Sequence, residues 1–260
     1  MLSRGRRSAR LFCVVLGFLG AAFFCLGHAT SQAADVQRLK QQAKQYYWGQ
    51  GVPQDYRQAL QLYLQAAELG DPDAQYIAGG MYFKGQGTAA DYQQAFKLLY
   101  LAAQNGKSTP ESQKLLAQAF IIGDPVPKNY PEAIKWYELA AAKGDRDAQN
   151  ELAFLYFVGR GVEQDFRKAY DLFRQAALNG LALAQYNLGI MLYTGNGVPQ
   201  ADLVEAYAWF NLAASAGNAA AASARQSLES ALTTSQLAAA QEKSRVLYET
   251  AGAATSSVAP

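Results

Sequence analysis

One stretch of the chain sets the pattern for the rest, and from Ala184 to Gly217 it reads AQYNLGIMLYTGNGVPQADLVEAYAWFNLAASAG. In its second half, apolar residues recur three, four, seven and eight positions after Ala206, which is the spacing of one helix face. A Gly-x-Gly-Val-Pro turn, residues 195–199, precedes this helix. Gly217 closes it, because glycine adopts the left-handed conformation at a helix end without steric penalty. The stretch therefore predicts two helices joined by a tight turn.

The same pattern occurs five times along the chain. The closing glycines follow one another at intervals of 36 to 38 residues, at Gly70, Gly106, Gly144, Gly180 and Gly217. The Gly-x-Gly turn recurs as Gly49–Gly51, Gly85–Gly87, Gly159–Gly161 and Gly195–Gly197, and the third repeat has Gly123 followed by Pro125. One hairpin cannot bury its apolar stripe alone, whereas about three or more stacked hairpins share a continuous core. The sequence predicts an all-α solenoid.

Small and large residues alternate in the predicted core. An alanine begins the apolar stripe of the second helix in every repeat, at Ala59, Ala95, Ala133, Ala169 and Ala206. A large side chain follows four residues later, namely Tyr63, Leu99, Tyr137, Phe173 and Phe210. Alanine lets two helix backbones approach closely, and we expect the large side chain to fill the neighbouring space.

The repeats set the domain boundaries. We expect a solenoid over residues 34–250, with repeats at about 35–70, 71–106, 107–144, 145–180 and 181–217. The first helix, 35–48, has a polar face suited to an N-terminal cap. Residues 218–250 are expected to form a C-terminal cap of two helices, the second opening with a capping box at Thr233 and Gln236 and ending at about Tyr248. Residues 251–260 are expected to be a disordered tail.

The first 33 residues have the composition of a secretory signal peptide. Four arginines come first, an uncharged apolar run from Leu11 to Gly27 follows, and small residues such as Ser31 and Ala33 come next. Cleavage after Ala33 is favoured over a retained membrane anchor, since seventeen apolar residues barely reach the length of a spanning helix. We expect a periplasmic or secreted protein, with attachment to the inner membrane through the N-terminal segment as the alternative.

Removing this segment changes the chemistry available to the chain. Both cysteines (Cys13, Cys25) and the single histidine (His28) lie inside it. Four of the 23 basic residues and none of the 21 acidic residues leave with it, so the net charge becomes −2. Nucleic-acid binding then lacks electrostatic support. Thiolate, imidazole and zinc chemistry lack their usual groups.

Three segments of the chain, Ala184–Gly189, Tyr193–Gln200 and Ala206–Gly217, resemble the Sel-1-like repeat, a tetratricopeptide-like helical hairpin. The resemblance covers about residues 35–250. It implies a right-handed α-solenoid and a non-catalytic adaptor that binds another protein, often in the bacterial periplasm. A cysteine-rich branch of the family closes each hairpin with a disulfide; this chain lacks those cysteines, so the properties of that branch do not carry over.

The remaining motifs favour structural roles. The Gly-x-Gly turns lack the strand and the lysine that phosphate-binding loops require. Asp71–Asp73 and Asp145–Asp147 could hold a hard cation, but helix capping explains both pairs. A glycosidase, which needs only two carboxylates, stays possible, although no pair stands out beyond these capping positions. We expect no catalytic residue, no metal and no cofactor.

Binding residues are predicted from the first helix of each repeat. In tetratricopeptide-like packing these helices line a concave groove, and the positions two before and two after the core leucine face into it. The candidate partner-binding residues are Tyr76, Lys114, Asn150, Phe154, Tyr186 and Ile190. Aromatic and amide side chains suit the anchoring of an extended peptide. The alternative is that the aromatic residues belong to the core.

Two functions fit these features. The first is a periplasmic adaptor or regulator that holds a protein partner in the groove. The second is a protein that binds envelope polysaccharide or peptidoglycan through aromatic stacking, for which the tyrosines and three tryptophans provide candidates. A hydrolase is the least favoured reading.

Overall fold

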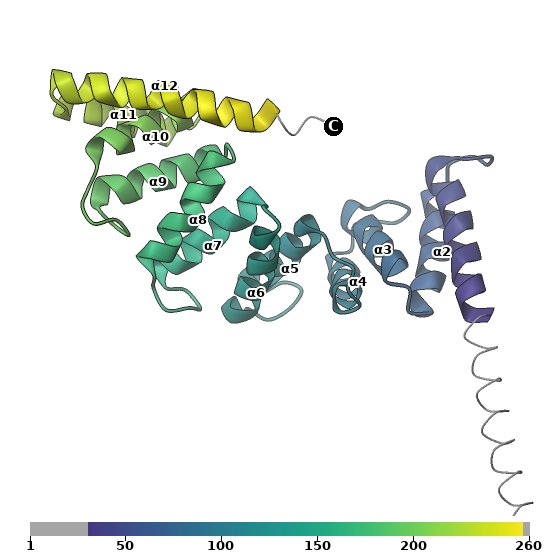
Figure 1. Ribbon diagram of the computed structural model, residues 1–260. Helices are drawn as coiled ribbons and strands as arrows, with labels where there is room; N and C mark the ends of the chain where they lie inside the picture. Colours follow the sequence, from purple (N-terminus) through teal and green to yellow (C-terminus); the bar gives the residue numbers. More distant parts are fainter. Residues whose placement is uncertain (1–30, 257–260) are drawn as a thin grey trace, which may run out of the picture. The chain divides into compact units, whose positions relative to one another are not determined.

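The computed structural model describes residues 31–256, with side chains as far as residue 250. This part of the chain consists of helices and short turns without a strand, and it forms the predicted all-α solenoid of helical hairpins (Figure 1). It divides into two compact units, one ending at Ser108 and the other beginning at Thr109. Residues 1–30, most of the expected signal peptide, lie outside the described residues.

The first unit contains two repeats. Its helices are residues 31–48, α2 (Tyr56–Glu68), α3 (Pro72–Lys84) and α4 (Tyr92–Gln104). The first helix begins four residues before the expected start at Asp35. In every repeat we call the first helix of the hairpin helix A and the second helix B, so that residues 31–48 and α3 are A helices, and α2 and α4 are B helices.

The second unit contains the other three repeats and the cap. Its helices are α5 (Pro110–Ile122), α6 (Tyr130–Ala142), α7 (Arg146–Val158), α8 (Phe166–Leu178), α9 (Ala182–Thr194), α10 (Leu203–Ser215), α11 (Ala219–Ala231) and α12 (Thr234–Ser256). Helices α11 and α12 both pack against α10, which closes the core at this end (Figure 1). The expected end of the last helix at about Tyr248 is too early, because α12 continues to Ser256. Residues 257–260 of the expected tail lie outside the described residues.

Short-range signals in the sequence place the helix ends. All five closing glycines have a positive φ, between 75° and 90°. Asp71 and Asp145 cap α3 and α7 as predicted, accepting hydrogen bonds from the backbone N–H groups of Ala74 (2.7 Å) and Ala148 (2.8 Å). The predicted capping box is present, since Gln236 N donates to Thr233 Oγ1 and Thr233 N donates to Gln236 Oε1. Each repeat is thereby delimited by its own residues.

The core follows the predicted alternation of small and large residues. The five predicted alanines and the five large side chains of the B helices are all buried. Each large side chain belongs to a hairpin whose helix A carries a very small residue, in chain order Ala43, Gly79, Ala117, Ala153 and Gly189. A Cβ atom built on Gly189 would lie 2.5 Å from Cε1 of Phe210, well inside contact distance. The side chain on helix B thus sets the size allowed on helix A.

The second glycine of the Gly-x-Gly turn serves the joint between repeats. A Cβ atom on Gly87 would lie 2.4 Å from the carbonyl oxygen of Tyr56, and one on Gly197 would lie 2.3 Å from that of Phe166. Tyr56 and Phe166 begin helix B of the preceding repeat. The turn of one repeat therefore rests directly on the backbone of the repeat before it, which agrees with a structural role for this motif.

The close contact at Gly189 gives a stability prediction. Gly189→Ala should lower the free energy of unfolding by about 1–3 kcal/mol, because the added methyl group overlaps the buried ring of Phe210. Denaturant unfolding measures this change. The control is Gly80→Ala in the interior of α3, where an added Cβ meets nothing within 4 Å and should stabilise the fold by about 0.5–1 kcal/mol. Equal effects of the two substitutions would contradict this packing.

Candidate partner-binding surface

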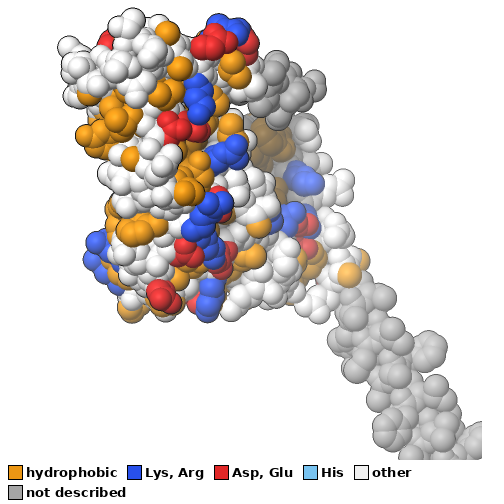
Figure 2. All heavy atoms as spheres, turned by 60° about the vertical axis from the view of Figure 1, so that its left-hand side comes forward, with side chains coloured by type: hydrophobic (Ala, Val, Ile, Leu, Met, Phe, Trp, Pro, Cys, Tyr) orange, Lys and Arg blue, Asp and Glu red, His pale blue; other side chains and the backbone are white. Residues whose placement is uncertain are grey.

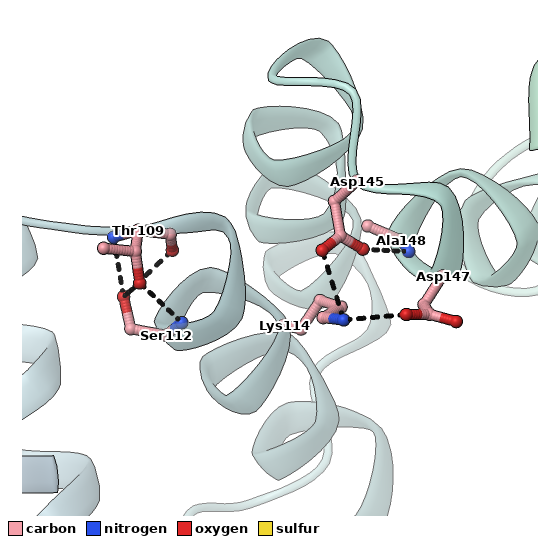
Figure 3. Close-up of polar contacts among 6 residues, drawn as sticks. All are labelled: Thr109, Ser112, Lys114, Asp145, Asp147 and Ala148. Carbon is pink, nitrogen blue, oxygen red and sulfur yellow. Dashed lines mark hydrogen bonds and ion pairs between the residues drawn. The ribbon is translucent and has the colours of Figure 1, made fainter. Parts of the chain in front are cut away.

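Lys114, one of the predicted binding residues, is held between two carboxylates of the next repeat. Its Nζ lies 3.2 Å from Oδ2 of Asp145 and 3.1 Å from Oδ2 of Asp147 (Figure 3). Asp145 uses its other oxygen to cap α7 through Ala148. Burial lowers the pKa of Lys114, but hydrogen bonds to Asp147 and Asp145 outweigh that effect and raise it above its usual value. The ammonium group thus joins α5 to α7.

Repeats one and two are joined in the same way. Lys40 Nζ lies 3.0 Å from a carboxylate oxygen of Asp71 and 3.0 Å from one of Asp73. Lys107 adds a second cation 2.7 Å from Asp73. We call a lysine of helix A with the Asp-x-Asp of the next repeat a lysine–aspartate joint. The predicted capping role is correct for Asp71 and Asp145, whereas Asp73 and Asp147 lie in the first turn of the helix. The lysine of the preceding repeat, which contacts both aspartates, was not predicted.

Asn150 is also part of a joint between repeats, and it is only 3% exposed. Its Oδ1 accepts a hydrogen bond of 3.0 Å from Nδ2 of Asn187, which joins α7 to α9. The expected groove-facing position of Asn150 is therefore corrected, because a buried side chain offers no surface to a partner.

The other predicted residues differ in exposure. Phe154 is 45% exposed, whereas Tyr186 and Ile190 are half-buried. The ring of Tyr186 packs against that of Phe210 with centroids 5.8 Å apart, so it belongs partly to the core. Tyr76 is half-buried and belongs to the first unit, whereas the other five belong to the second.

The repeats provide an internal comparison for Phe154. The residues at its position in the five A helices are Lys44, Gly80, Gln118, Phe154 and Ile190. Repeats with lysine, glycine or glutamine at this place form the same hairpin, so the fold does not require an aromatic ring here. One turn further along, the corresponding residues are Trp48, Lys84, Ile122, Val158 and Thr194, again without a common requirement.

The joints fix the register of neighbouring A helices in the second unit. Lys114 meets Asp147, and Asn150 meets Asn187. Phe154 and Ile190 occupy one position of helix A, and Ile122 and Val158 occupy the position one turn further along, so all four lie toward the C-terminal ends of α5, α7 and α9. Ile122 is 65% exposed and Val158, one turn beyond Phe154, is 38% exposed.

We call Ile122, Phe154, Val158 and Ile190 the apolar row. Ile122 and Val158 were not predicted from the sequence, although a signal was present: each places an apolar side chain at a position where the second repeat has a lysine and the fifth a threonine. Exposed apolar side chains grouped on one surface indicate an interaction site more strongly than single ones do.

The charged residues near the apolar row include Glu151, which lies three residues before Phe154 on α7. Helix α9 has no charged residue, and Asp147 on α7 is neutralised by Lys114. Figure 2 shows basic and acidic side chains beside one another on the face that it presents, with hydrophobic side chains in patches between them. Within residues 31–256, no group of three or more histidine, cysteine, aspartate or glutamate residues is placed to hold a metal ion.

These features define a class of protein, the α-solenoid built from helical hairpins. Five Sel1 repeats match the chain, at residues 43–71, 72–107, 110–145, 146–181 and 182–218. The chain belongs to the Sel1 repeat family, whose members typically serve as scaffolds for protein–protein interactions and are generally non-catalytic. The matched segments leave out Ser108 and Thr109, which explains why the interval between Gly106 and Gly144 is the longest of the series.

Solved bacterial structures support this assignment. A Sel1 repeat protein from Oxalobacter formigenes is 30% identical, with a TM-score of 0.60, over 73% of this chain and 75% of that one. A protective antigen of uropathogenic Escherichia coli with the same repeat fold is also 30% identical, with a TM-score of 0.55, over 89% of this chain. This chain spans 57% of the length of that antigen. Comparison with curated protein sequences finds no match.

The joint at Asp73 gives a pH prediction. Hydrogen bonds from Lys107 and Lys40 hold the pKa of Asp73 below its usual value. The ionised carboxylate therefore stabilises the fold above the unfolded-state pKa of about 3.9, and this stabilisation is lost as the pH falls through the lowered folded-state pKa. Asp73→Asn should be less stable than the natural chain at neutral pH, and the difference should vanish in acid. Urea unfolding at a series of pH values measures it.

A second substitution tests the origin of this effect. In the Asp73→Asn background, Lys107→Gln should cost less stability than it does in the natural chain, because the carboxylate that Lys107 contacts is gone. A difference between Asp73→Asn and the natural chain that persists unchanged at low pH would contradict the assignment.

Proposed function

We propose that this protein is a non-catalytic scaffold of the bacterial envelope and that its partner, a protein, docks on the apolar row of the second unit. The observation that supports this proposal is the exposure of Ile122, Phe154 and Val158 at positions that the repeat does not reserve for apolar residues. A fold that tolerates polar residues at these places gains no stability from an exposed ring. A binding surface does gain from it, because aromatic and aliphatic anchors carry much of the energy of protein interfaces.

The arrangement of the row suits a segment of polypeptide. The three A helices α5, α7 and α9 present apolar side chains in succession, and half-buried tyrosine and asparagine side chains of α9 flank them. Apolar anchors with adjacent hydrogen-bonding groups match an extended or helical peptide with apolar residues at regular intervals. Rigid helices hold the anchors, so that little conformational entropy is lost on binding.

The location in the periplasm rests on the N-terminal sequence. Its arginines, apolar run and small residues are those of an export signal, and cleavage after Ala33 would release the solenoid. None of the helices in residues 31–256 has both the length and the apolar character needed to cross a membrane. A retained N-terminal segment would instead attach the same solenoid to the inner membrane.

The proposal predicts that single substitutions in the row remove the partner. After crosslinking in envelopes of the producing bacterium, the natural chain should recover a stoichiometric protein partner. Phe154→Gln and Ile122→Gln should each weaken that binding by at least about tenfold, since anchor residues of an interface contribute more than about 1.4 kcal/mol each. Affinity measured with the purified partner gives the magnitude.

The matched control is Leu139→Gln. Leu139 is 48% exposed on α6, a B helix outside the row, so this substitution removes an exposed aliphatic side chain elsewhere. Melting temperatures of all three variants should stay close to that of the natural chain, because surface substitutions seldom change stability by more than about 0.5 kcal/mol. Undiminished binding by both row variants, or retention on insoluble cell wall without any protein partner, would refute the proposal.

A further inference from the structure

Trp48, the last residue of the first helix, is 65% exposed. The same position carries Lys84, Ile122, Val158 and Thr194 in the other repeats, so the hairpin does not need an indole there. Tryptophan is the largest side chain, and leaving most of it in water is unfavourable unless the ring has a binding role. This residue belongs to the first unit, whereas the apolar row belongs to the second.

A hydrogen-bonded tyrosine packs against one edge of the indole. The ring of Tyr47 meets that of Trp48 edge-on, with centroids 4.9 Å apart, and meets that of Tyr56 edge-on at 5.2 Å. The hydroxyl of Tyr47 donates to Oε1 of Gln86 at 3.2 Å. Gln54 donates both to the backbone carbonyl of Tyr47 (2.8 Å) and to the hydroxyl of Tyr56 (3.1 Å). The indole thus packs at one edge against a tyrosine that is itself held in place, and the rest of the indole stays open to a ligand.

Two lysines belong to the same two A helices as Trp48 and its equivalent position in the next repeat. Lys44 is one helical turn before Trp48 and therefore on the same face of the helix. Lys84 occupies the position equivalent to Trp48 in the next repeat, two residues before Gln86, which contacts Tyr47. Both lysines are exposed, and neither forms an ion pair with another residue in the described part of the chain. This differs from Lys40 and Lys107 of the same unit, which are held by aspartates.

We propose that Trp48 with Lys44 and Lys84 forms a binding site for an acidic polysaccharide. The apolar C–H face of a pyranose ring stacks on a flat aromatic face, because the ring quadrupole attracts the positive C–H edges. Carboxylates of neighbouring sugar units then meet the two ammonium groups. An acidic peptide would use the lysines as well, but it would have no need of an exposed indole.

The test uses oligogalacturonate, a chain of carboxylated pyranose rings, and the full-length protein. Calorimetric titration should give binding that weakens with added salt. Trp48→Ala should reduce the affinity at least ~10-fold, as the loss of an aromatic stacking residue does in proteins that bind single-stranded nucleic acid. The double variant Lys44→Gln, Lys84→Gln should reduce the affinity and flatten its dependence on salt.

Three matched comparisons make the result specific. Tyr248→Ala removes an exposed aromatic ring from α12, and Lys97→Gln removes an exposed lysine from α4; neither should change binding. The methyl ester of the same oligosaccharide keeps the rings but lacks the charges, and it should bind more weakly than the acid. Each variant should keep the melting temperature of the natural chain, since all of these side chains are exposed.

Four outcomes would overturn the inference. The first is that oligogalacturonate does not bind at millimolar concentration, and the second is that Trp48→Ala leaves its binding unchanged. The third is that the acid and its methyl ester bind with equal affinity. The fourth is that a polyglutamate peptide binds as tightly as oligogalacturonate and that this binding does not depend on Trp48. None of them bears on the apolar row, so the two proposals stand or fall separately.

Discussion

The structure depends on how closely helices A and B of one repeat can approach each other. In each hairpin, a residue with at most a methyl group on helix A belongs with one large side chain on helix B, as Gly189 does with Phe210. Interiors pack at crystal-like density, so a single added carbon at this contact displaces a buried ring. The same constraint recurs at each repeat and at the turns, where Gly87 and Gly197 allow backbone-to-backbone contact between repeats. Stacking of the hairpins follows from these contacts.

Most of the fold could be predicted from the sequence because its signals are local and repeated. A closing glycine, a capping aspartate and an alanine stripe each act within a few residues, and five copies remove the ambiguity of any one of them. The predicted end of the last helix, at about Tyr248, was wrong. Gly252 follows Tyr248, yet α12 continues through it to Ser256, and the alanines on either side of this glycine favour the helix.

The candidate site was predicted only in part, since its residues depend on contacts between repeats. Helical spacing correctly placed Lys114 and Asn150 on helix A, but it does not reveal which side chains the next repeat brings opposite. Lys114 meets carboxylates more than thirty residues away, and Asn150 meets an asparagine of α9. Phe154 and Ile190 remain candidates because no joint uses them. The sequence does allow each position to be compared with its equivalents in the other repeats. This comparison adds Ile122 to the candidate binding residues.

The joints themselves show how the repeat separates stability from binding. Between repeats one and two, and again between three and four, a lysine forms ion pairs with an Asp-x-Asp. Between repeats four and five, Leu181 and Leu183 replace the aspartates, and a pair of hydrogen-bonded asparagines replaces the lysine. The charged side chains of Lys40 and Asp71 are each only 13% exposed, so the loss of one partner would leave the other partly buried and uncompensated. The charged side chains at these joints therefore stabilise the fold as ion pairs. Exposed side chains that neither pair with a neighbouring repeat nor recur at equivalent positions, such as Phe154 and Trp48, are then the ones left to interact with other molecules.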